Sequence, residues 1–207
     1  MGDYIKTFIR VRPAIATDSG PNCLLIKNDK TVQLKNDNEA PKSVDRVFSD
    51  MDDNGTVWDV VGGPAMEYLG NGKQVVICVQ GKIGSGKTHT VRGGDNCENI
   101  SDSIVGRIIQ ALAGNEETNL TVLYFHKDIP QDLITGADNL KIKYDDTGAS
   151  CEGSTTVRIP KAEAGYEHIK KCIQKRNELM AKSPCSETTT FLVYIFGQGV
   201  GRLTVIE

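Results

Sequence analysis

The sequence predicts a three-layer α/β/α domain with a mixed central sheet. Strand-like and helix-like apolar segments alternate along the 207 residues, which is typical of layered α/β folds. The apolar run 75–79 leads directly into a glycine-rich loop, as a buried parallel strand would. The segments 191–196 and 202–206 flank a short glycine-rich turn and predict a terminal antiparallel hairpin. Together these observations indicate one sheet with both parallel and antiparallel neighbours.

Short strands and one broken helix are predicted before the glycine-rich loop. The expected strands are 4–12, 23–27, 31–34 and 44–48. Pro13 ends the first strand, because proline cannot donate a backbone hydrogen bond. Asn28-Asp29 predicts a hairpin turn between the second and third strands. Apolar spacing over 56–69 predicts a helix that Gly62-Gly63-Pro64 kinks or breaks.

Two helices and further strands are predicted after the loop. Ser101 or Asp102 is expected to cap a helix that ends at Gly114. A longer helix is expected over 161–180, where apolar residues recur at helical spacing. The remaining expected strands are 120–125, 140–144, 155–159, 191–196 and 202–206. Of these, 140–144 and 155–159 are predicted to pair with each other.

Composition and charge indicate one ordinary globular domain over residues 1–207. The chain has 24 basic and 27 acidic residues and a net charge of −3, which gives no nucleic-acid or membrane signature. No segment resembles a signal peptide, and no apolar run approaches membrane-spanning length. The six cysteines lack C-x-x-C spacing, so free thiols in the cytoplasm are expected rather than a zinc site.

Residues 81–88 carry the strongest chemical signal in the chain. They read Gly-Lys-Ile-Gly-Ser-Gly-Lys-Thr and match the phosphate-binding pattern G-x-x-x-x-G-K-[ST]. Glycines let backbone N–H groups approach phosphate oxygens, the lysine reaches the β- and γ-phosphates, and the threonine hydroxyl ligates Mg²⁺. The predicted fold is therefore P-loop NTPase-like. The predicted nucleotide-binding residues are Gly81, Gly84, Ser85, Gly86, Lys87 and Thr88, with Thr88 as the metal ligand.

Further motifs stand in a recognisable order around this loop. Residues 9–13 contain R-x-R-P, and residues 44–48 look like an F-D-x-V-F strand. Residues 81–90 are similar to G-Q-T-G-S-G-K-T-[YH]-T, while 104–107 and 132–134 look like a G-I-I-P-R helix start and a D-L-L element. This order resembles the kinesin motor domain over nearly the whole chain.

The resemblance implies a kinesin-type adenine-nucleotide pocket. It places Arg10, Arg12 and Pro13 beside the adenine and ribose, and it places His89 against the base. The implied cofactors are ATP or ADP with Mg²⁺. The implied partner is a microtubule or tubulin, in the cytoplasm and on the cytoskeleton, with neither nucleic acid nor membrane as a partner.

Two switch elements depart from the family pattern. Switch I, N-x-x-S-S-R-S-H in the family, aligns with 181–188, where Pro184 constrains the backbone and the uncharged Ser186 cannot form the family's ion pair. The switch II strand ends at Glu207, which could stand in for the metal-side aspartate with one extra methylene. The family's C-terminal microtubule-binding helices follow this point and are expected to be missing. The pattern predicts nucleotide binding and argues against efficient turnover; no catalytic residue is assigned.

The sequence leaves three functions open. The first is a kinesin-like nucleotide-binding protein of microtubule-based systems. The second is a structural or regulatory subunit of a microtubule assembly that hardly turns over its nucleotide. The third is another small P-loop NTPase or kinase, against which the sequence offers no N-K-x-D motif and no arginine-rich lid. Because the strand 191–196 is apolar on both faces, we also expect another protein to cover one face of the sheet.

Overall fold

The computed structural model describes residues 5–16, 18, 23–35, 40–127, 129–138, 140–145, 148–182, 190–199 and 201–207. The chain divides into two compact units, Met1–Val57 and Trp58–Glu207, and each is described by itself. The single domain expected over residues 1–207 stays a prediction. Among the described residues, no helix combines the length and apolar character that crossing a membrane requires.

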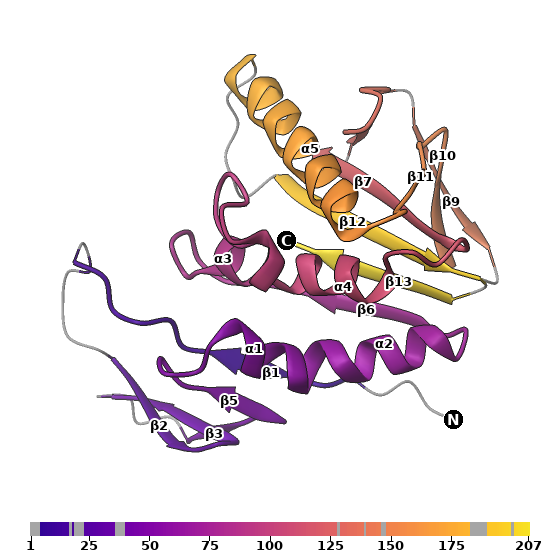
Figure 1. Cartoon of the computed structure of the whole chain (residues 1–207). Coiled ribbons are helices and arrows are strands. Elements are labelled where there is room, and N and C mark those ends of the chain that lie inside the picture. Colours follow the sequence, from indigo (N-terminus) through magenta and orange to yellow (C-terminus); the bar gives the residue numbers. More distant parts are fainter. Residues whose placement is uncertain are drawn as a thin grey trace. The chain divides into compact units, whose positions relative to one another are not determined.

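The first unit consists of two small sheets and one helical turn (Figure 1). Its elements are β1 (Phe8–Arg10), β2 (Leu24–Asn28), β3 (Thr31–Leu34), β4 (Lys42–Ser43), β5 (Arg46–Phe48) and α1 (Asn54–Val57). The predicted hairpin of β2 and β3 is confirmed, and β1 pairs in parallel with β5. The expected strand 4–12 is shorter than predicted, and β4 was not foreseen.

The second unit contains the predicted mixed sheet. Its strands are β6 (Gln74–Cys78), β7 (Thr118–His126), β8 (Ile129–Asp132), β11 (Val157–Arg158), β12 (Thr190–Gln198) and β13 (Gly201–Ile206). They follow the order β11-β7-β12-β13-β6, with β8 paired to β7. The terminal hairpin of β12 and β13 is confirmed, and β6 runs parallel to β13.

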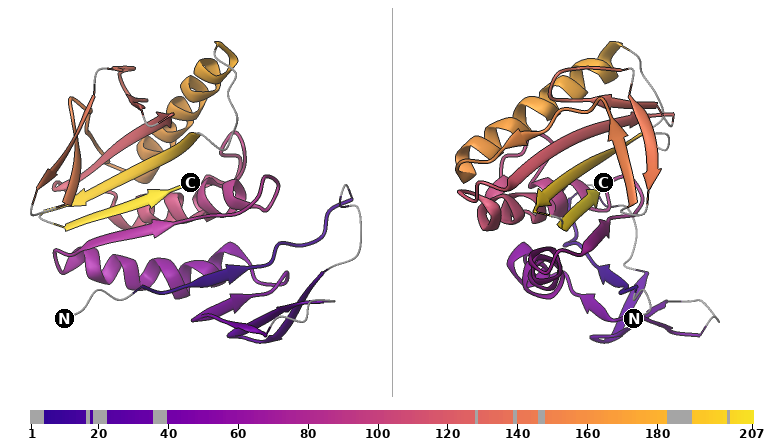
Figure 2. Two further views of the ribbon diagram at one scale, coloured as in Figure 1. Left: turned by 180° about the vertical axis from the view of Figure 1, so that it is seen from behind. Right: turned by 90° about the vertical axis from the view of Figure 1, so that its right-hand side faces the viewer.

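The helices of the second unit lie against one face of this sheet, so its described residues form two of the three layers predicted (Figures 1 and 2). They are the π-helical turn η1 (Trp58–Gly62), α2 (Gly63–Gly70), α3 (Lys87–Arg92), the 3-10 turn η2 (Ile100–Asp102), α4 (Ile104–Leu112) and α5 (Ala162–Lys182). The predicted kink or break near Gly62 corresponds to the π-helical turn η1, which lies between α1 and α2 without a gap in the helical residues. A Cβ on Gly62 would lie 2.1 Å from the ring of Trp58, so the turn packs on its own tryptophan.

Strand register explains which residues form the core under these helices. Paired residues on neighbouring strands share a face, so Val205, Tyr194 and Val122 lie in one row. All three are fully buried. On the opposite face Val76 of β6 is 62% exposed. The prediction that the strand before the loop is buried is therefore wrong. It failed because a run of apolar residues does not reveal whether one face or both faces are covered.

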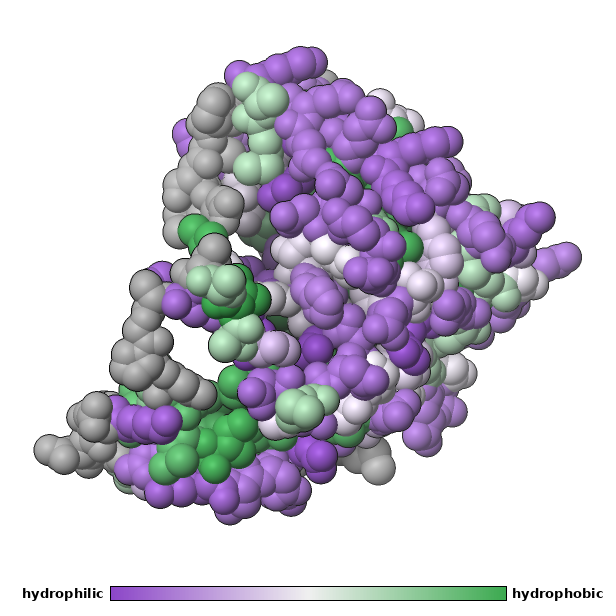
Figure 3. All heavy atoms as spheres, turned by 60° about the vertical axis from the view of Figure 1, so that its left-hand side comes forward, coloured by the Kyte–Doolittle hydropathy of each residue, from purple (hydrophilic) through white to green (hydrophobic). Residues whose placement is uncertain are grey.

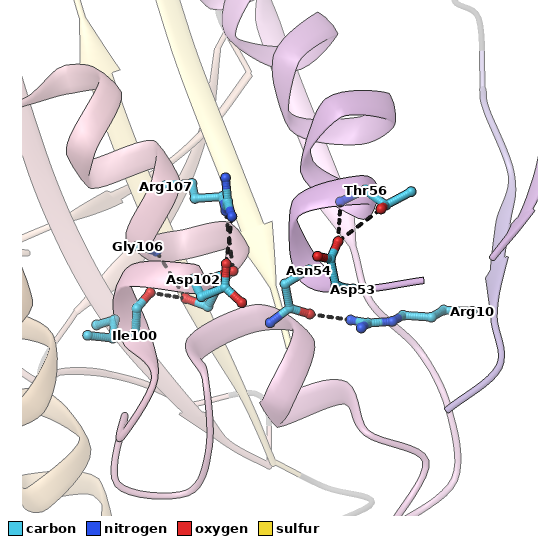
Figure 4. Close-up of polar contacts among 9 residues, drawn as sticks. Arg10, Asp53, Asn54, Thr56, Ile100, Asp102, Gly106 and Arg107 are labelled. Atoms are coloured by element: carbon cyan, nitrogen blue, oxygen red, sulfur yellow. Dashed lines mark hydrogen bonds and ion pairs between the residues drawn. The ribbon is translucent and has the colours of Figure 1, made fainter. Parts of the chain in front are cut away.

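The start of α4 corrects the predicted cap. Residues 100–102 form the 3-10 turn, and the cap is Ser103, whose hydroxyl accepts a hydrogen bond from the Gly106 backbone N–H at 3.1 Å. The same hydroxyl donates to the Ile100 carbonyl at 2.7 Å, and Arg107 pairs with Asp102 at 2.6 Å (Figure 4). The serine is the residue with extended backbone immediately before the helix, as capping requires.

The predicted pairing of 140–144 with 155–159 is also wrong. β9 (Lys141–Asp145) pairs with β10 (Gly148–Glu152), a segment that looked like a polar loop. Val157 and Arg158 instead join β7 in the main sheet. Lys143 pairs with Ser150 and Glu152 with Lys141, so Lys143 and Glu152 are diagonal neighbours across the two strands, and they form a 2.7 Å ion pair. Residues 141–144 of β9 are exposed to solvent, and polar side chains suit such an exposed hairpin.

Candidate functional site

The glycine-rich loop connects β6 to α3, the position predicted from its motif. Gly84 and Gly86 have φ values of 78° and 91°, in the left-handed region where side chains other than glycine are strained. The Ser85 backbone N–H donates to the Lys82 carbonyl at 3.0 Å, which closes the turn. The two glycines are therefore required by the backbone path as well as by the motif.

A cavity of about 820 Å³ opens over this loop. Among the predicted residues, its lining includes Gly81, Gly84, Gly86, Lys87, Thr88 and His89, whereas Ser85 is not among its lining residues. The Lys87 ammonium donates to the Gly81 carbonyl at 2.7 Å and to the Lys82 carbonyl at 3.2 Å. The Lys87 ammonium is therefore held at the loop by two uncharged carbonyl oxygens. A negatively charged phosphate oxygen is a stronger acceptor and would replace them.

The end of β13 meets the loop at the same edge of the sheet. Because β6 and β13 are parallel neighbours, their carboxyl ends place Glu207 beside Thr88. The Thr88 hydroxyl donates a 2.6 Å hydrogen bond to Glu207 Oε1. A hydroxyl and a carboxylate side by side are oxygen donors of the kind Mg²⁺ prefers, so these two residues fit the expected metal. No cluster of three or more His, Cys, Asp or Glu residues suited to a metal occurs in the described part of the chain.

A buried arginine, Arg92, lies close to the other oxygen of the Glu207 carboxylate. The Arg92 and Glu207 side chains are 3% and 7% exposed, and Arg92 Nη1 lies 3.6 Å from Glu207 Oε2. Burial by itself would lower the pKa of Arg92, but the neighbouring Tyr194 and Glu207 outweigh it and the pKa is raised. The Tyr194 hydroxyl donates to Glu207 Oε2 at 3.4 Å, and burial raises the tyrosine pKa. Burial also raises the pKa of nearby Cys97 to about 11.

Two arginines of the cavity were missed from the sequence. Arg92 and Arg176 both line it, together with Tyr124 and Phe191. Arg176 lies on α5, and its buried Nε has no hydrogen-bond partner among the described residues. The sequence signal for Arg92 is its place at the end of the helix that follows the loop. No local signal connects Arg176 with a loop almost one hundred residues earlier.

Arg10, Arg12 and Pro13 belong to the first unit. The Arg10 guanidinium donates to Asn54 Oδ1 at 2.5 Å and to the Asp52 carbonyl at 3.3 Å (Figure 4). Arg12 pairs with Asp18 at 2.5 Å and also donates to the Pro13 carbonyl. That pairing lowers the pKa of Asp18 to about 2. The predicted place of these residues beside an adenine stays a prediction.

The predicted switch I segment lies mostly outside the described residues. Ala181 and Lys182 end α5, whereas Pro184 and Ser186 fall within 183–189, which the structure does not describe.

Comparison with known proteins identifies the family. The kinesin motor domain family model matches residues 10–188, which is most of the chain. The chain belongs to the kinesin motor domain family. A solved structure titled as that of a fast kinesin has a TM-score of 0.85 at 15% identity, which confirms the predicted fold. The alignment covers 98% of this chain and 64% of that one.

The kinesin relatives are much longer than the matched region. The rice kinesin-like protein KIN-7K, chloroplastic, from Oryza sativa subsp. japonica, is 27% identical over 161 residues. Kinesin-like protein KIF15 of Mus musculus is 30% identical over 113 residues, and klp-19 of Caenorhabditis elegans is 26% identical over 112. The matches cover 73%, 52% and 52% of this kinesin-family chain but 15%, 8% and 10% of the respective relatives.

Proposed function

We propose that this kinesin-family chain binds ATP or ADP together with Mg²⁺ in the cavity over residues 81–88. The observation that carries the proposal is the 2.6 Å hydrogen bond from Thr88 to Glu207, two residues that line that cavity. It joins the loop's hydroxyl to the carboxylate at the end of the neighbouring parallel strand. This pairing brings phosphate-binding and metal-binding groups to one point, as a nucleotide with its metal requires.

Each group of the cavity has a defined part in binding. Lys87 exchanges its two carbonyl partners for phosphate oxygens, and the backbone N–H groups of the loop donate to the same phosphates. Thr88 would hold the metal through its hydroxyl oxygen while its O–H group continues to donate a hydrogen bond to Glu207 Oε1. Arg176, which also lines the cavity, adds a further positive side chain. Bound Mg²⁺ would neutralise part of the negative charge of the phosphates.

We further propose that turnover is slow. Hydrolysis requires a positioned water and stabilisation of the transferring phosphoryl group as well as a phosphate cradle. The segment aligned with switch I lacks the family's serines and arginine. The chain would then act in microtubule-based systems mainly by holding a nucleotide, as a kinesin-like protein or as a regulatory subunit of a microtubule assembly.

Calorimetry with ADP and ATP in Mg²⁺ tests binding. Lys87→Ala should abolish measurable binding, because it removes the cation at the loop. Lys73→Ala is the matched control, since Lys73 is exposed and precedes β6 at its other end. Equal affinities of the wild type and the Lys87 variant would refute the proposed site.

Phosphate release with and without microtubules tests turnover, and co-sedimentation tests the microtubule partner. We expect turnover far below that of an active motor, with or without microtubules. A motor-like rate that Lys87→Ala abolishes would contradict slow turnover while supporting the site.

We also propose that another protein covers the sheet face opposite the helices. Phe125 and Phe191 stack there with ring centroids 4.5 Å apart, and Val76 is 62% exposed. By contrast, hydrophilic side chains gather over the outer surface of α5 (Figure 3). Binding of an apolar dye that Val76→Lys reduces would support a docking face. Monodisperse monomers without dye binding would contradict it.

A further inference from the structure

The two oxygens of the Glu207 carboxylate serve different partners. Oε1 accepts the hydrogen bond from the Thr88 hydroxyl at 2.6 Å, on the side of the loop. Oε2 faces the interior, 3.6 Å from Arg92 Nη1 and 3.4 Å from the Tyr194 hydroxyl. The metal-side carboxylate is therefore already engaged by a fixed cation.

The charge of Arg92 is permanent in this setting. A guanidinium stays protonated at every physiological pH, so Arg92 presents a fixed positive charge to Glu207. The other titratable side chains near it are Tyr194, Cys97 and Glu98, and the Glu98 carboxylate also interacts electrostatically with Arg92. The guanidinium therefore lies 3.6 Å from the Glu207 carboxylate and also interacts with the Glu98 carboxylate.

Stability alone does not account for this arrangement. Arg92 is 2% exposed, and its Nη1 has no hydrogen-bond partner among the described residues. The distance of 3.6 Å allows electrostatic attraction without a hydrogen bond. A buried donor left unpaired costs free energy, and a buried ion pair often contributes little net stability. What the pair does change is the electrostatic potential at the Thr88 hydroxyl.

We propose that Arg92 is a built-in counter-charge for Glu207, so that this site binds nucleotide with little dependence on Mg²⁺. A carboxylate attracts a divalent cation strongly only while its own charge is uncompensated. With Arg92 beside it, Glu207 still orients Thr88 but attracts the metal less. Arg92 is thus a positioning residue that acts through Glu207. The proposal rests on the nucleotide binding proposed above.

The test measures the affinity for ADP by calorimetry, once in excess EDTA and once in saturating Mg²⁺. The ratio of the two dissociation constants gives the coupling between metal and nucleotide. For the wild type we expect this ratio to stay below about tenfold. Arg92→Gln, which removes the charge but keeps a polar side chain, should raise it by about tenfold. Arg92→Lys, which keeps the charge, should leave it near the wild-type value.

The outcomes separate this inference from the proposed function. A wild-type ratio above about tenfold, or equal ratios in the wild type and Arg92→Gln, would overturn the inference while nucleotide binding stands. Absence of ADP binding in both buffers would overturn the two together. A merely structural role would weaken binding equally in both buffers and leave the ratio unchanged. If Arg92→Gln does not fold, the wild-type ratio still decides.

Discussion

The Thr88 hydroxyl and the Glu207 carboxylate, 119 positions apart in the sequence, are joined by a hydrogen bond of 2.6 Å. This bond ties the phosphate loop to the end of β13. Arg92 and the Tyr194 hydroxyl approach the other oxygen of the same carboxylate, so three groups depend on one side chain. The relationship makes Glu207 the residue whose loss should disturb the site most.

Glu207→Ala should destabilise the fold through Arg92. Removing one member of a buried ion pair leaves the other charge uncompensated, and we expect a loss of about 3 kcal/mol in the free energy of unfolding. Denaturant unfolding measures it. Glu167→Ala is the control, because Glu167 pairs with Lys170 on the exposed side of α5 and should change stability by less than about 0.5 kcal/mol. Equal effects of the two substitutions would contradict the role given to Glu207.

Arg176→Ala should weaken ADP binding. Arg176 lines the cavity, so its guanidinium is placed to contact a phosphate there. We expect an affinity loss of about tenfold, as for one charge-assisted hydrogen bond. Lys175→Ala removes a neighbouring charge that does not line the cavity and should leave affinity unchanged. If both variants bind ADP like the wild type, Arg176 does not contact the nucleotide.

Asp132 should make stability depend on pH in the acid range. Its fully buried carboxylate accepts hydrogen bonds from the backbone N–H groups of Ile134 and Thr155 and from the Thr135 hydroxyl. Burial opposes ionisation, yet these bonds outweigh it and lower the pKa of Asp132. A lowered folded-state pKa gives stability that is present above the unfolded-state value of about 3.9 and is lost as pH falls through the folded-state value.

Asp132→Asn tests this dependence directly. An amide group keeps the size of the carboxylate but faces backbone donors with its own NH₂ group, so we expect a loss of about 2 kcal/mol at neutral pH. The variant should also lose less stability than the wild type when denaturant unfolding is repeated at progressively lower pH. A parallel loss in both proteins would mean that other groups cause the acid sensitivity.

Gly106→Ala should be strongly destabilising. A Cβ at this position would lie 1.7 Å from the Ile100 carbonyl oxygen, at the tight passage from η2 into α4. Backbone would have to move, which costs about 3 kcal/mol or more. Gly70→Ala is a matched control, since nothing lies within 4 Å of its Cβ position, and it should be neutral or slightly stabilising. A shift in melting temperature for Gly106→Ala no larger than for Gly70→Ala would refute the steric argument.

Local chemistry made several elements predictable. The β2–β3 hairpin follows from Asn28-Asp29 between two apolar runs, and the kink or break predicted from Gly62-Gly63-Pro64 corresponds to the turn η1. The β12–β13 hairpin follows from two apolar runs on either side of a short glycine-rich turn. The errors came where the sequence was ambiguous: a polar segment formed β10, and an apolar run in β6 proved half-exposed.

The sequence alone determined the phosphate loop, because the pattern from Gly81 to Thr88 is contiguous and its glycines must adopt positive φ at Gly84 and Gly86. The tertiary structure decided what surrounds that loop. Parallel pairing of β6 with β13 brought Glu207 to Thr88, and the packing of α5 brought Arg176 to the cavity. The ion pair of Arg92 with Glu207 also depends on that strand pairing. No residue spacing encodes these contacts, since electrostatic interactions between distant positions exist only after the chain has folded.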